Sequence, residues 1–383
     1  MRGAEPADAP DEAFTLADYE RRARALLPPA IWDFIAGGAG EERTLRANEA
    51  AFERLWLLPR VLTGAGRPIT GIRLLGRDWP APIGVAPVAY HTLVHPEGEI
   101  ATARGAARAG LPFVVSTFAG TVLEDIAAVA GGPLWLQLYC FRDRDVTRRL
   151  VERAEHAGFE AIVLTVDAPR LGRRLRDVRN DFRLPPGVAP ANISGDDFAS
   201  PAGHAAVAFD PALDWSVLSW LRSVSGLPIV LKGILGTSDA RRAVAAGADA
   251  IVVSNHGGRQ LDGSPATLEM LPGIVAAVAG GVPVLIDGGV RRGVDVLACL
   301  ALGAAAVLVG RPVLHGLTAG GADGVAGVLG ILLDELQDTM ALTGVDSLEA
   351  VDRSLVAQRE QLPHLPLAGL GTPPLLPDAA WRT

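Results

Sequence analysis

Short apolar runs rich in β-branched residues alternate with alanine-rich stretches from about residue 81 onward. A short apolar run bounded by glycine or proline is typical of a strand buried on both faces, whereas the alanine-rich stretches have the composition of helices. The pattern therefore predicts a parallel sheet in which strands and helices alternate. The predicted strands cover residues 82–86, 112–116, 134–139, 161–167, 228–233, 250–255, 283–288 and 305–310.

Eight strands that alternate with helices favour a (β/α)8 barrel, or TIM barrel, over an open doubly wound sheet. No predicted strand is followed by the G-x-G-x-x-G sequence of open dinucleotide-binding sheets. We place the barrel core at about 81–345, within one domain that covers residues 15–360. An N-terminal helical extension is predicted over residues 15–38, whereas residues 1–14 are expected to be disordered and residues 361–383 to form a proline-rich tail.

The connection after the fourth predicted strand, residues 168–227, is much longer than the others and is rich in proline, glycine, asparagine and aspartate. A long connection at the mouth of a barrel often forms a lid over the site. Its first part, residues 169–180, is rich in arginine, and Arg174 is the one that we expect to bind a substrate carboxylate. For the other arginines of this stretch, a solvated charged surface is the alternative interpretation.

In a barrel of this kind, catalytic and binding residues lie at the C-terminal ends of the strands. Most of the predicted strands end at or just before polar residues or glycines. A serine or threonine at one end could simply cap the next helix, but capping does not explain all the ends together. The residues at or just after the ends include Pro87, Val88, Ala89, Ser116, Gln137, Tyr139, Thr165, Asp167, Lys232, Ser254, His256, Asp287, Gly288, Gly289, Gly310 and Arg311.

The sixth predicted strand leads into the sequence SNHGGRQLD, residues 254–262. Its glycines allow the backbone to approach a ligand closely, and His256 and Arg259 place a proton acceptor beside an anion-binding guanidinium. By itself the segment could also be a surface turn with a packed histidine and a solvated arginine. Its place at a strand end favours a catalytic role.

The last two strand ends, DGGVRRG at residues 287–293 and LVGR at residues 308–311, combine glycines with Arg291 and Arg311. Glycine-rich backbone, a helix N-terminus and arginines at these two strands commonly bind a phosphate group, although a glycine turn without a ligand is the alternative. The hydrogen-bonding side chains at the other ends suit the edge of a planar ring with many heteroatoms. A flavin with its phosphate satisfies both parts of the site.

Lys232 is the only lysine among 35 basic residues. Nucleotide bias explains the excess of arginine, and one lysine could persist by chance on the surface, but Lys232 closes a buried strand. An ammonium group there would stabilise the negative charge of a reduced flavin. His256 would accept a proton, with Asp167 stabilising the imidazolium, and Arg174 and Arg259 would bind an anionic substrate. These roles together describe the oxidation of a 2-hydroxy acid.

The net charge of −8 and the pI near 5.4 argue against a nucleic-acid partner, which requires a basic surface. Cys140 and Cys299 belong to no paired cysteine or histidine motif, so we predict neither a disulfide framework nor a metal site. No signal peptide opens the sequence, and no apolar run reaches the roughly 18 residues of a membrane span. We therefore expect a soluble, cytoplasmic protein with no membrane partner.

The sequence resembles the FMN-dependent α-hydroxy acid oxidases and dehydrogenases over about residues 15–360. The resemblance is carried by HPEGE (95–99), LTVDAPRLGRR (164–174), LKG (231–233), SNHGGRQLD, DGGVRRG and VGRP (309–312). It implies a TIM barrel that oxidises a small 2-hydroxy acid with O2, and a homotetramer. The implied FMN ligands are Pro87, Val88, Ala89, Ser116, Gln137, Thr165, Lys232, Ser254, Asp287, Gly288, Gly289, Arg291, Gly310 and Arg311.

The resemblance also implies that His256 is the catalytic base, that Asp167 is its partner and that Tyr139 contacts the reacting α-oxygen. Arg259 and Arg174 would bind the substrate carboxylate. Glycolate-oxidase-like members carry a tyrosine that contacts this carboxylate where the present sequence has Phe34.

Phe34, Tyr90 and Phe118 are expected near the mouth and would suit an aromatic substrate side chain, although Phe34 could instead be part of the core. Residues 32–40, 116–120 and 134–143 are similar to those of 4-hydroxymandelate oxidases. The resemblance thus implies that an aromatic (S)-2-hydroxy acid, 4-hydroxymandelate or mandelate, is oxidised to a phenylglyoxylate-type 2-oxo acid while O2 becomes H2O2.

The sequence leaves several alternative functions open. The enzyme could be a lactate- or glycolate-type oxidase, or a mandelate-type dehydrogenase that passes electrons to another acceptor. Alanine at position 89 accompanies oxidases in the family, and residues 168–227 lack the extra apolar segment of membrane-bound dehydrogenases. A flavin-binding protein without turnover would not need His256 as a base, and a barrel that binds a phosphate without a flavin is the remaining possibility.

Overall fold

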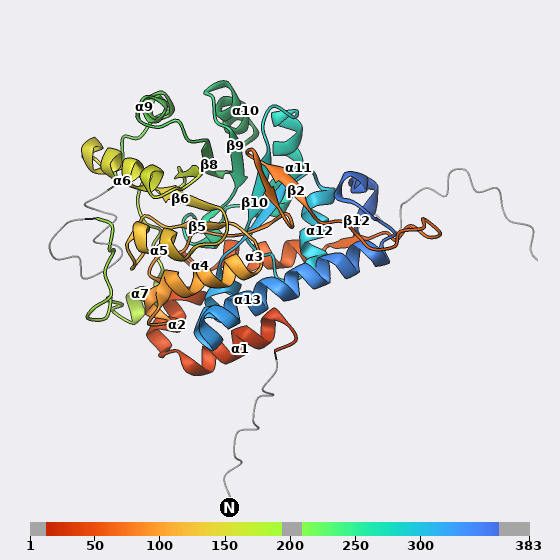
Figure 1. Cartoon of the computed structure of the whole chain (residues 1–383), viewed down its shortest axis with the longest axis horizontal. Helices are drawn as coiled ribbons and strands as arrows, with labels where there is room; N and C mark the ends of the chain where they lie inside the picture. Colours follow the sequence, from red (N-terminus) through yellow and green to blue (C-terminus); the bar gives the residue numbers. More distant parts are fainter. Residues whose placement is uncertain (1–12, 194–208, 360–383) are drawn as a thin grey trace, which may run out of the picture.

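A computed structural model of the chain describes residues 13–193 and 209–359, and shows a closed barrel of parallel strands surrounded by helices (Figure 1). Around the barrel the strands follow the order β10-β11-β4-β5-β6-β7-β8-β9, so neighbours in sequence are neighbours in space. All eight predicted strands are present, and the predicted (β/α)8 fold is confirmed. The strands are β4 (Ile83–Val85), β5 (Phe113–Val115), β6 (Leu134–Leu138), β7 (Ala161–Thr165), β8 (Ile229–Ile234), β9 (Ala250–Val253), β10 (Val284–Asp287) and β11 (Ala306–Val309).

The barrel strands separate two apolar layers. Within β7, Val163 belongs to the cluster that fills the barrel, whereas Ile162 and Leu164 pack in the larger cluster between strands and helices. Both sides of the strand are therefore apolar, which explains why these strands appear in the sequence as continuous apolar runs. The hairpin of β2 (Ile72–Leu74) and β3 (Arg77–Trp79) closes the N-terminal end of the barrel, where Trp79 packs against Trp135. The C-terminal end is left for the site.

The outer layer consists of the helices that follow the strands. The 32-residue helix α13 (Arg311–Leu342) is interrupted at Gly320 and Gly321 and packs against α1, α4 and α12. The outer helices are α4 (Gly98–Arg108), α5 (Leu123–Val129), α6 (Arg144–His156), α9 (Ser216–Val224), α10 (Thr237–Ala245), α11 (Thr267–Val278), α12 (Gly293–Ala301) and α13. The remaining short elements are the 3-10 turns at His91–Leu93, His256–Gly258, Leu348–Ala350 and Arg353–Leu355.

One expectation about apolar runs needs correction. Among the described helices, α13 is long and apolar enough to cross a membrane by length and composition. Its apolar residues pack on other helices of the domain, and its first residue, Arg311, lines the cavity at the barrel mouth. Packing inside the domain thus accounts for its composition.

The N-terminal extension is helical, as predicted over residues 15–38, and it is divided into two helices. The chain forms α1 (Leu16–Leu26) and α2 (Pro29–Ala36), separated at Pro28, because two consecutive prolines supply no amide hydrogen to continue the first helix. Gly37 ends α2. A third helix that was not predicted, α3 (Arg43–Glu53), leads to β1 (Leu55–Leu57), which pairs with β12 (Val356–Gln358).

The long connection after β7 is only partly described, because residues 194–208 lie outside the described ranges. Its first part contains α7 (Leu175–Arg179), which contacts α2 beside the barrel mouth (Figure 1). At the start of the second described range, Phe209 forms an isolated β-bridge with Phe141. The predicted disorder of residues 1–14 falls almost wholly outside the described residues, and the predicted tail falls wholly outside them.

Candidate functional site

A cavity opens at the C-terminal ends of the barrel strands. Most of the residues predicted from the sequence line it: Phe34, Pro87, Val88, Ala89, Tyr90, Ser116, Phe118, Gln137, Tyr139, Thr165, Arg174, Lys232, His256, Arg259, Asp287, Gly288, Gly289, Arg291, Gly310 and Arg311. Two predicted residues, Asp167 and Ser254, do not line the cavity and instead lie behind residues that do.

His256 lies between a carboxylate and the cavity. Its Nδ1 donates to Asp167 Oδ1 at 2.9 Å, and its Nε2 lies 3.4 Å from the Tyr139 hydroxyl. Because Nδ1 carries the hydrogen of the neutral ring, Nε2 is the free proton acceptor. Burial lowers the pKa of His256 below its usual value, against the opposing effect of Asp167, so the neutral form dominates at neutral pH.

Asp167 stays ionised in this buried position. Burial disfavours its charge, but His256 and Lys232 outweigh burial and hold the pKa of the Asp167 carboxyl below its usual value. Gly233 makes room for it: a Cβ at Gly233 would lie 2.6 Å from the Asp167 Cβ, and its φ of +112° is strained for any other residue. A carboxylate in this place would stabilise an imidazolium if His256 accepted a proton.

Lys232 projects from β8 into the centre of the site. Its Nζ donates to Ser254 Oγ at 2.9 Å and lies 3.1 Å from Asp287 Oδ2. Burial would lower the pKa of Lys232, yet Asp287 and Asp167 raise it above the usual value, so the buried group is an ammonium ion. Ser254 also accepts from the backbone amide of His256 at 3.1 Å and thereby links the two functional side chains.

Polar side chains from three neighbouring strand ends form a hydrogen-bonded row beside Lys232. Ser116 donates to Gln137 Oε1 at 3.2 Å, and Gln137 Nε2 donates to Thr165 Oγ1 at 3.0 Å. All three side chains are buried and line the cavity. Such a row fits the heteroatoms at the edge of a flavin ring.

The opposite end of the cavity is built from glycines and arginines. Gly288 and Gly289 have φ of +94° and +88°, and a Cβ at Gly289 would lie 2.2 Å from the Asn48 carbonyl oxygen. Only glycine fits there. Burial and the neighbouring Arg291 lower the pKa of Arg311 to about 10. Arg291 pairs with Glu49 at 2.7 Å, but Arg311 has no carboxylate partner among the described residues. An anion would offset the repulsion between these half-buried like charges, so this end fits a phosphate group.

Arg174 and Arg259 form a second cationic pair beside Phe34. Their guanidinium carbons lie 5.7 Å and 5.2 Å from the centre of the Phe34 ring, whose other contact is the stacked ring of Phe182 at 4.5 Å. Burial and the charges of Arg174 and Arg311 lower the pKa of Arg259 well below its usual value. A bound carboxylate would offset this repulsion.

Aromatic side chains form one wall of the cavity. Tyr139 stacks on Phe209 with a centroid distance of 4.3 Å and lies 5.6 Å from Phe118, which in turn stacks on Tyr90 at 6.2 Å. Burial raises the pKa values of Tyr139 and Tyr90, so both remain phenols. The wall offers a flat apolar surface beside the arginine pair.

Several cavity residues were missed by sequence reasoning. Phe209 belongs to the long connection after β7, where no periodic pattern or motif marks it. Leu171 lies within LTVDAPRLGRR, but it and the others flank predicted residues and have no polar side chain of their own. The missed lining residues are Ile35, Ala86, Leu171, Phe209, Gly257, Val290, Leu308, Val309 and Leu314.

Comparisons with known proteins agree with this geometry. The model of the FMN-dependent dehydrogenase family matches residues 23–358. The chain is 52% identical to 4-hydroxymandelate oxidase of Amycolatopsis orientalis over 347 residues, which cover 88% of this chain and 97% of that protein. It is 49% identical to L-lactate oxidase of a Nostoc species, over 89% of this chain and 97% of that protein.

Solved structures show the same similarity. A crystal structure of mandelate oxidase superposes with a TM-score of 0.85 and 51% identity, covering 90% of this chain and 98% of the other. A structure of mandelate oxidase with (S)-4-hydroxymandelic acid gives a TM-score of 0.87 and 50% identity, covering 90% and 99%. The barrel, the polar row beside Lys232 and the glycine-arginine end fit one flavin mononucleotide, and with these matches the chain belongs to the FMN-dependent dehydrogenase family and uses FMN.

Proposed function

We propose that this enzyme oxidises an aromatic (S)-2-hydroxy acid, 4-hydroxymandelate or mandelate, to the corresponding 2-oxo acid. The observation that carries the proposal is that one cavity joins the pair Arg174 and Arg259, the side chain of His256 and an aromatic wall. The arginines suit a carboxylate, and the wall suits an aryl group. Relatives named 4-hydroxymandelate oxidase and mandelate oxidase, each about half identical to this chain, support the same substrate class.

The side chains assign the steps of the reaction. Arg174 and Arg259 bind the carboxylate and so orient the α-carbon toward His256. Tyr139 contacts the α-oxygen of the substrate. Nε2 of His256 accepts a proton from the substrate, and Asp167 stabilises the imidazolium that forms. FMN supplies an acceptor for the two electrons. The ammonium of Lys232 offsets the negative charge that arrives with them.

We further propose O2 as the oxidant, reduced to H2O2. Ala89 lines the cavity, and the family resemblance associates alanine at this position with oxidases. The curated relatives cited above are also named oxidases. A dehydrogenase that passes its electrons to another acceptor is the second candidate, because the same residues would reduce the flavin in either enzyme.

Anaerobic mixing tests both parts of this function. The yellow holoenzyme is mixed separately with (S)- and (R)-mandelate, 4-hydroxymandelate, lactate and glycolate, and air is then admitted. We expect the (S)-aromatic acids to bleach the flavin fastest, and rapid recolouring with formation of H2O2 in air. Fastest bleaching by glycolate would contradict the aromatic substrate, and slow recolouring would favour the dehydrogenase.

The pKa of His256 predicts the acid side of the pH profile. The base works in its neutral form, and its pKa lies below the usual 6.5 because of burial. Protonation therefore removes activity as the pH falls: kcat/KM should be constant near neutral pH and drop about tenfold per pH unit below that pKa. Steady-state rates across the acidic range measure this limb. An inflection on the alkaline side of pH 7 would contradict the environment described for His256.

Phe34→Tyr is expected to shift the preference away from aromatic acids. The new hydroxyl would contact the substrate carboxylate beside Arg174 and Arg259, as the tyrosine of glycolate-oxidase-like members does. This contact should favour glycolate, whose binding depends mainly on its carboxylate, and lower the ratio of kcat/KM for 4-hydroxymandelate over glycolate about tenfold. Phe182→Tyr is the matched control, since Phe182 stacks on Phe34 without lining the cavity. An unchanged ratio in Phe34→Tyr would show that Phe34 does not select the substrate.

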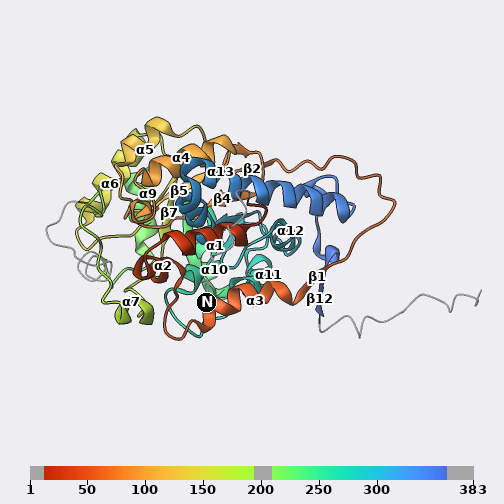
Figure 2. The ribbon, with the colours of Figure 1, turned by 90° about the horizontal axis from the view of Figure 1, so that it is seen from below.

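We propose, finally, that the protein is a cytoplasmic homotetramer. The segment between β1 and β2 projects away from the barrel (Figure 2) and exposes large apolar side chains, as an interface between copies would require. Val61 is 80% exposed, Leu62 101% and Ile69 68%. Light scattering during gel filtration measures the mass, which we expect to be about four times 39.9 kDa.

A further inference from the structure

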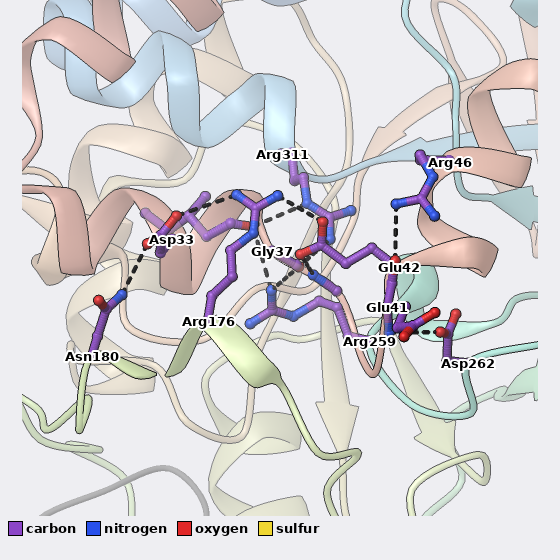
Figure 3. A network of polar contacts seen from close by, with 12 residues as sticks. Asp33, Gly37, Glu41, Glu42, Arg46, Arg176, Asn180, Arg259, Asp262 and Arg311 are labelled. Carbon is purple, nitrogen blue, oxygen red and sulfur yellow. Dashed lines mark hydrogen bonds and ion pairs between the residues drawn. The ribbon is translucent and has the colours of Figure 1, made fainter. Parts of the chain in front are cut away.

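Two half-buried arginines of the site share an unusual support. Among the described residues, neither Arg259 nor Arg311 forms an ion pair with a carboxylate. Both donate instead to the same two backbone oxygens. Gly37 accepts from Arg259 Nη1 at 2.7 Å and from Arg311 Nη2 at 2.9 Å (Figure 3). Ile35 accepts from Arg311 Nε at 3.0 Å and from Arg259 Nη1 at 3.4 Å.

These oxygens lie at the C-terminal end of α2. The last carbonyl groups of a helix have no partner within the helix and carry its partial negative charge, so they favour nearby cations. A carboxylate in this place would neutralise the arginines and compete with an incoming anion, whereas carbonyl oxygens leave the full positive charge available. One helix end thus supports an arginine at the substrate end and an arginine at the phosphate end.

The end of α2 is itself fixed by Arg176 of α7. Arg176 Nη1 lies 3.3 Å from Asp33 Oδ1, and Nη2 lies 2.7 Å from Glu42 Oε2. The other oxygen of Glu42 accepts from the Gly38 amide at 3.0 Å. Figure 3 shows Arg176 spanning both carboxylates across the turn that contains Gly37.

The packing around the turn leaves little freedom. A Cβ at Gly37 would lie 3.2 Å from Arg176 Cδ, so the alkyl chain of Arg176 rests on the backbone that supports the two arginines. Glu42 has a φ of +62°, a strained backbone for a residue with a side chain, and its ion pair with Arg176 and its bond to Gly38 keep it there. Loss of Arg176 would release both constraints.

We infer that Arg176 is a positioning residue that holds the end of α2, and through it both Arg259 and Arg311. The cofactor phosphate and the substrate carboxylate are therefore bound by arginines with one common support. For Arg259 and the substrate carboxylate, this inference rests on the proposed function. For Arg311 and the phosphate, it rests on the FMN site. Ligands at the two ends should respond together to a change at Arg176.

The test is Arg176→Met, studied as the full chain. We expect FMN to bind about tenfold more weakly, measured by flavin fluorescence on titrating the apoprotein, and KM for (S)-mandelate to rise by about the same factor. The rate of flavin reduction at saturating FMN and substrate, and its pH dependence, should stay near the wild-type values, because His256 and Asp167 do not contact Arg176. Arg176→Lys should restore part of both affinities.

Arg179→Met is the matched control, since Arg179 is exposed on the same helix and should leave both affinities unchanged. Glu42→Gln removes the ion pair between Arg176 and Glu42 while keeping Arg176. If Arg176→Met folds poorly, this variant should show the same weakening of FMN binding and the same rise in KM. A change at one end of the cavity without the other would overturn the inference, as would an equal loss in Arg179→Met. If no 2-hydroxy acid reduces the wild-type flavin, the proposed function fails. In that case the affinities of Arg176→Met for FMN and for phenylacetate still test the inference. Phenylacetate is a carboxylate without a hydroxyl group, and its binding is followed by the change in the flavin spectrum.

Discussion

His256→Gln is expected to retain FMN and to reduce its flavin with (S)-mandelate about a thousandfold more slowly than the wild type. Glutamine keeps a hydrogen-bonding side chain at the end of β9 but has no group that accepts a proton at neutral pH. The neighbouring Tyr139 cannot replace it, because burial raises the pKa of its phenol. Anaerobic stopped-flow measurement of the visible flavin absorbance gives the rate directly.

Asp167→Asn is the companion variant for this experiment. It removes the charge that stabilises the imidazolium while preserving the size of the side chain next to Gly233. We expect an intermediate loss of rate and an acid limb at lower pH, since the carboxylate no longer raises the pKa of His256. Reduction of His256→Gln at a near wild-type rate would remove His256 as the base.

Lys232→Met is expected to destabilise the fold as well as the reduced flavin. Lys232 is 4% exposed and pairs with Asp287, which is 6% exposed, so the substitution leaves a buried carboxylate without its cation. Breaking one side of a buried pair costs about 3–5 kcal/mol of the free energy of unfolding. Urea denaturation of the apoproteins measures this cost separately from cofactor binding.

The double variant Lys232→Met with Asp287→Asn separates the two effects of Lys232. It removes the stranded charge and should recover part of the stability, but flavin reduction should remain slow because no ammonium faces the ring. Lys232→Arg should also perform poorly, since a planar guanidinium cannot occupy the space between Ser254 and Asp287. A Lys232→Met apoprotein that unfolds at the wild-type urea concentration would contradict the buried ion pair.

The barrel could be predicted from the sequence because its strands are buried on both faces. Each strand is a short continuous apolar run, and the alternation with helices leaves few topologies to consider. The N-terminal extension was harder to predict. Its helical composition continues across Pro28 and Pro29, so the sequence predicts a helical extension over residues 15–38 without its division into two helices. Helix α3 is missed because its polar residues hide a short buried face.

Residues at strand ends could be predicted as site residues because a closed barrel brings all such ends to one mouth. The same reasoning could not distinguish residues that face the cavity from residues that support them. Ser254 contacts Lys232 and Asp167 contacts His256, but neither Ser254 nor Asp167 lines the cavity. This difference depends on the direction in which each side chain points at its strand end. The roles of these residues stay predictions that the variants above test.

The sequence by itself determined the eight strands, the mouth at which chemistry can occur and the family-typical residues around it, because these depend on local composition and on order along the chain. Only the tertiary structure decided which distant segments meet. Phe182 and Phe209 come from the long connection after β7, which has no periodic pattern, and their stacking on Phe34 and Tyr139 depends on the path of that connection. Likewise, the end of α2 supports both Arg259 and Arg311 because three separate segments converge there, and such convergence leaves no mark in any one of them.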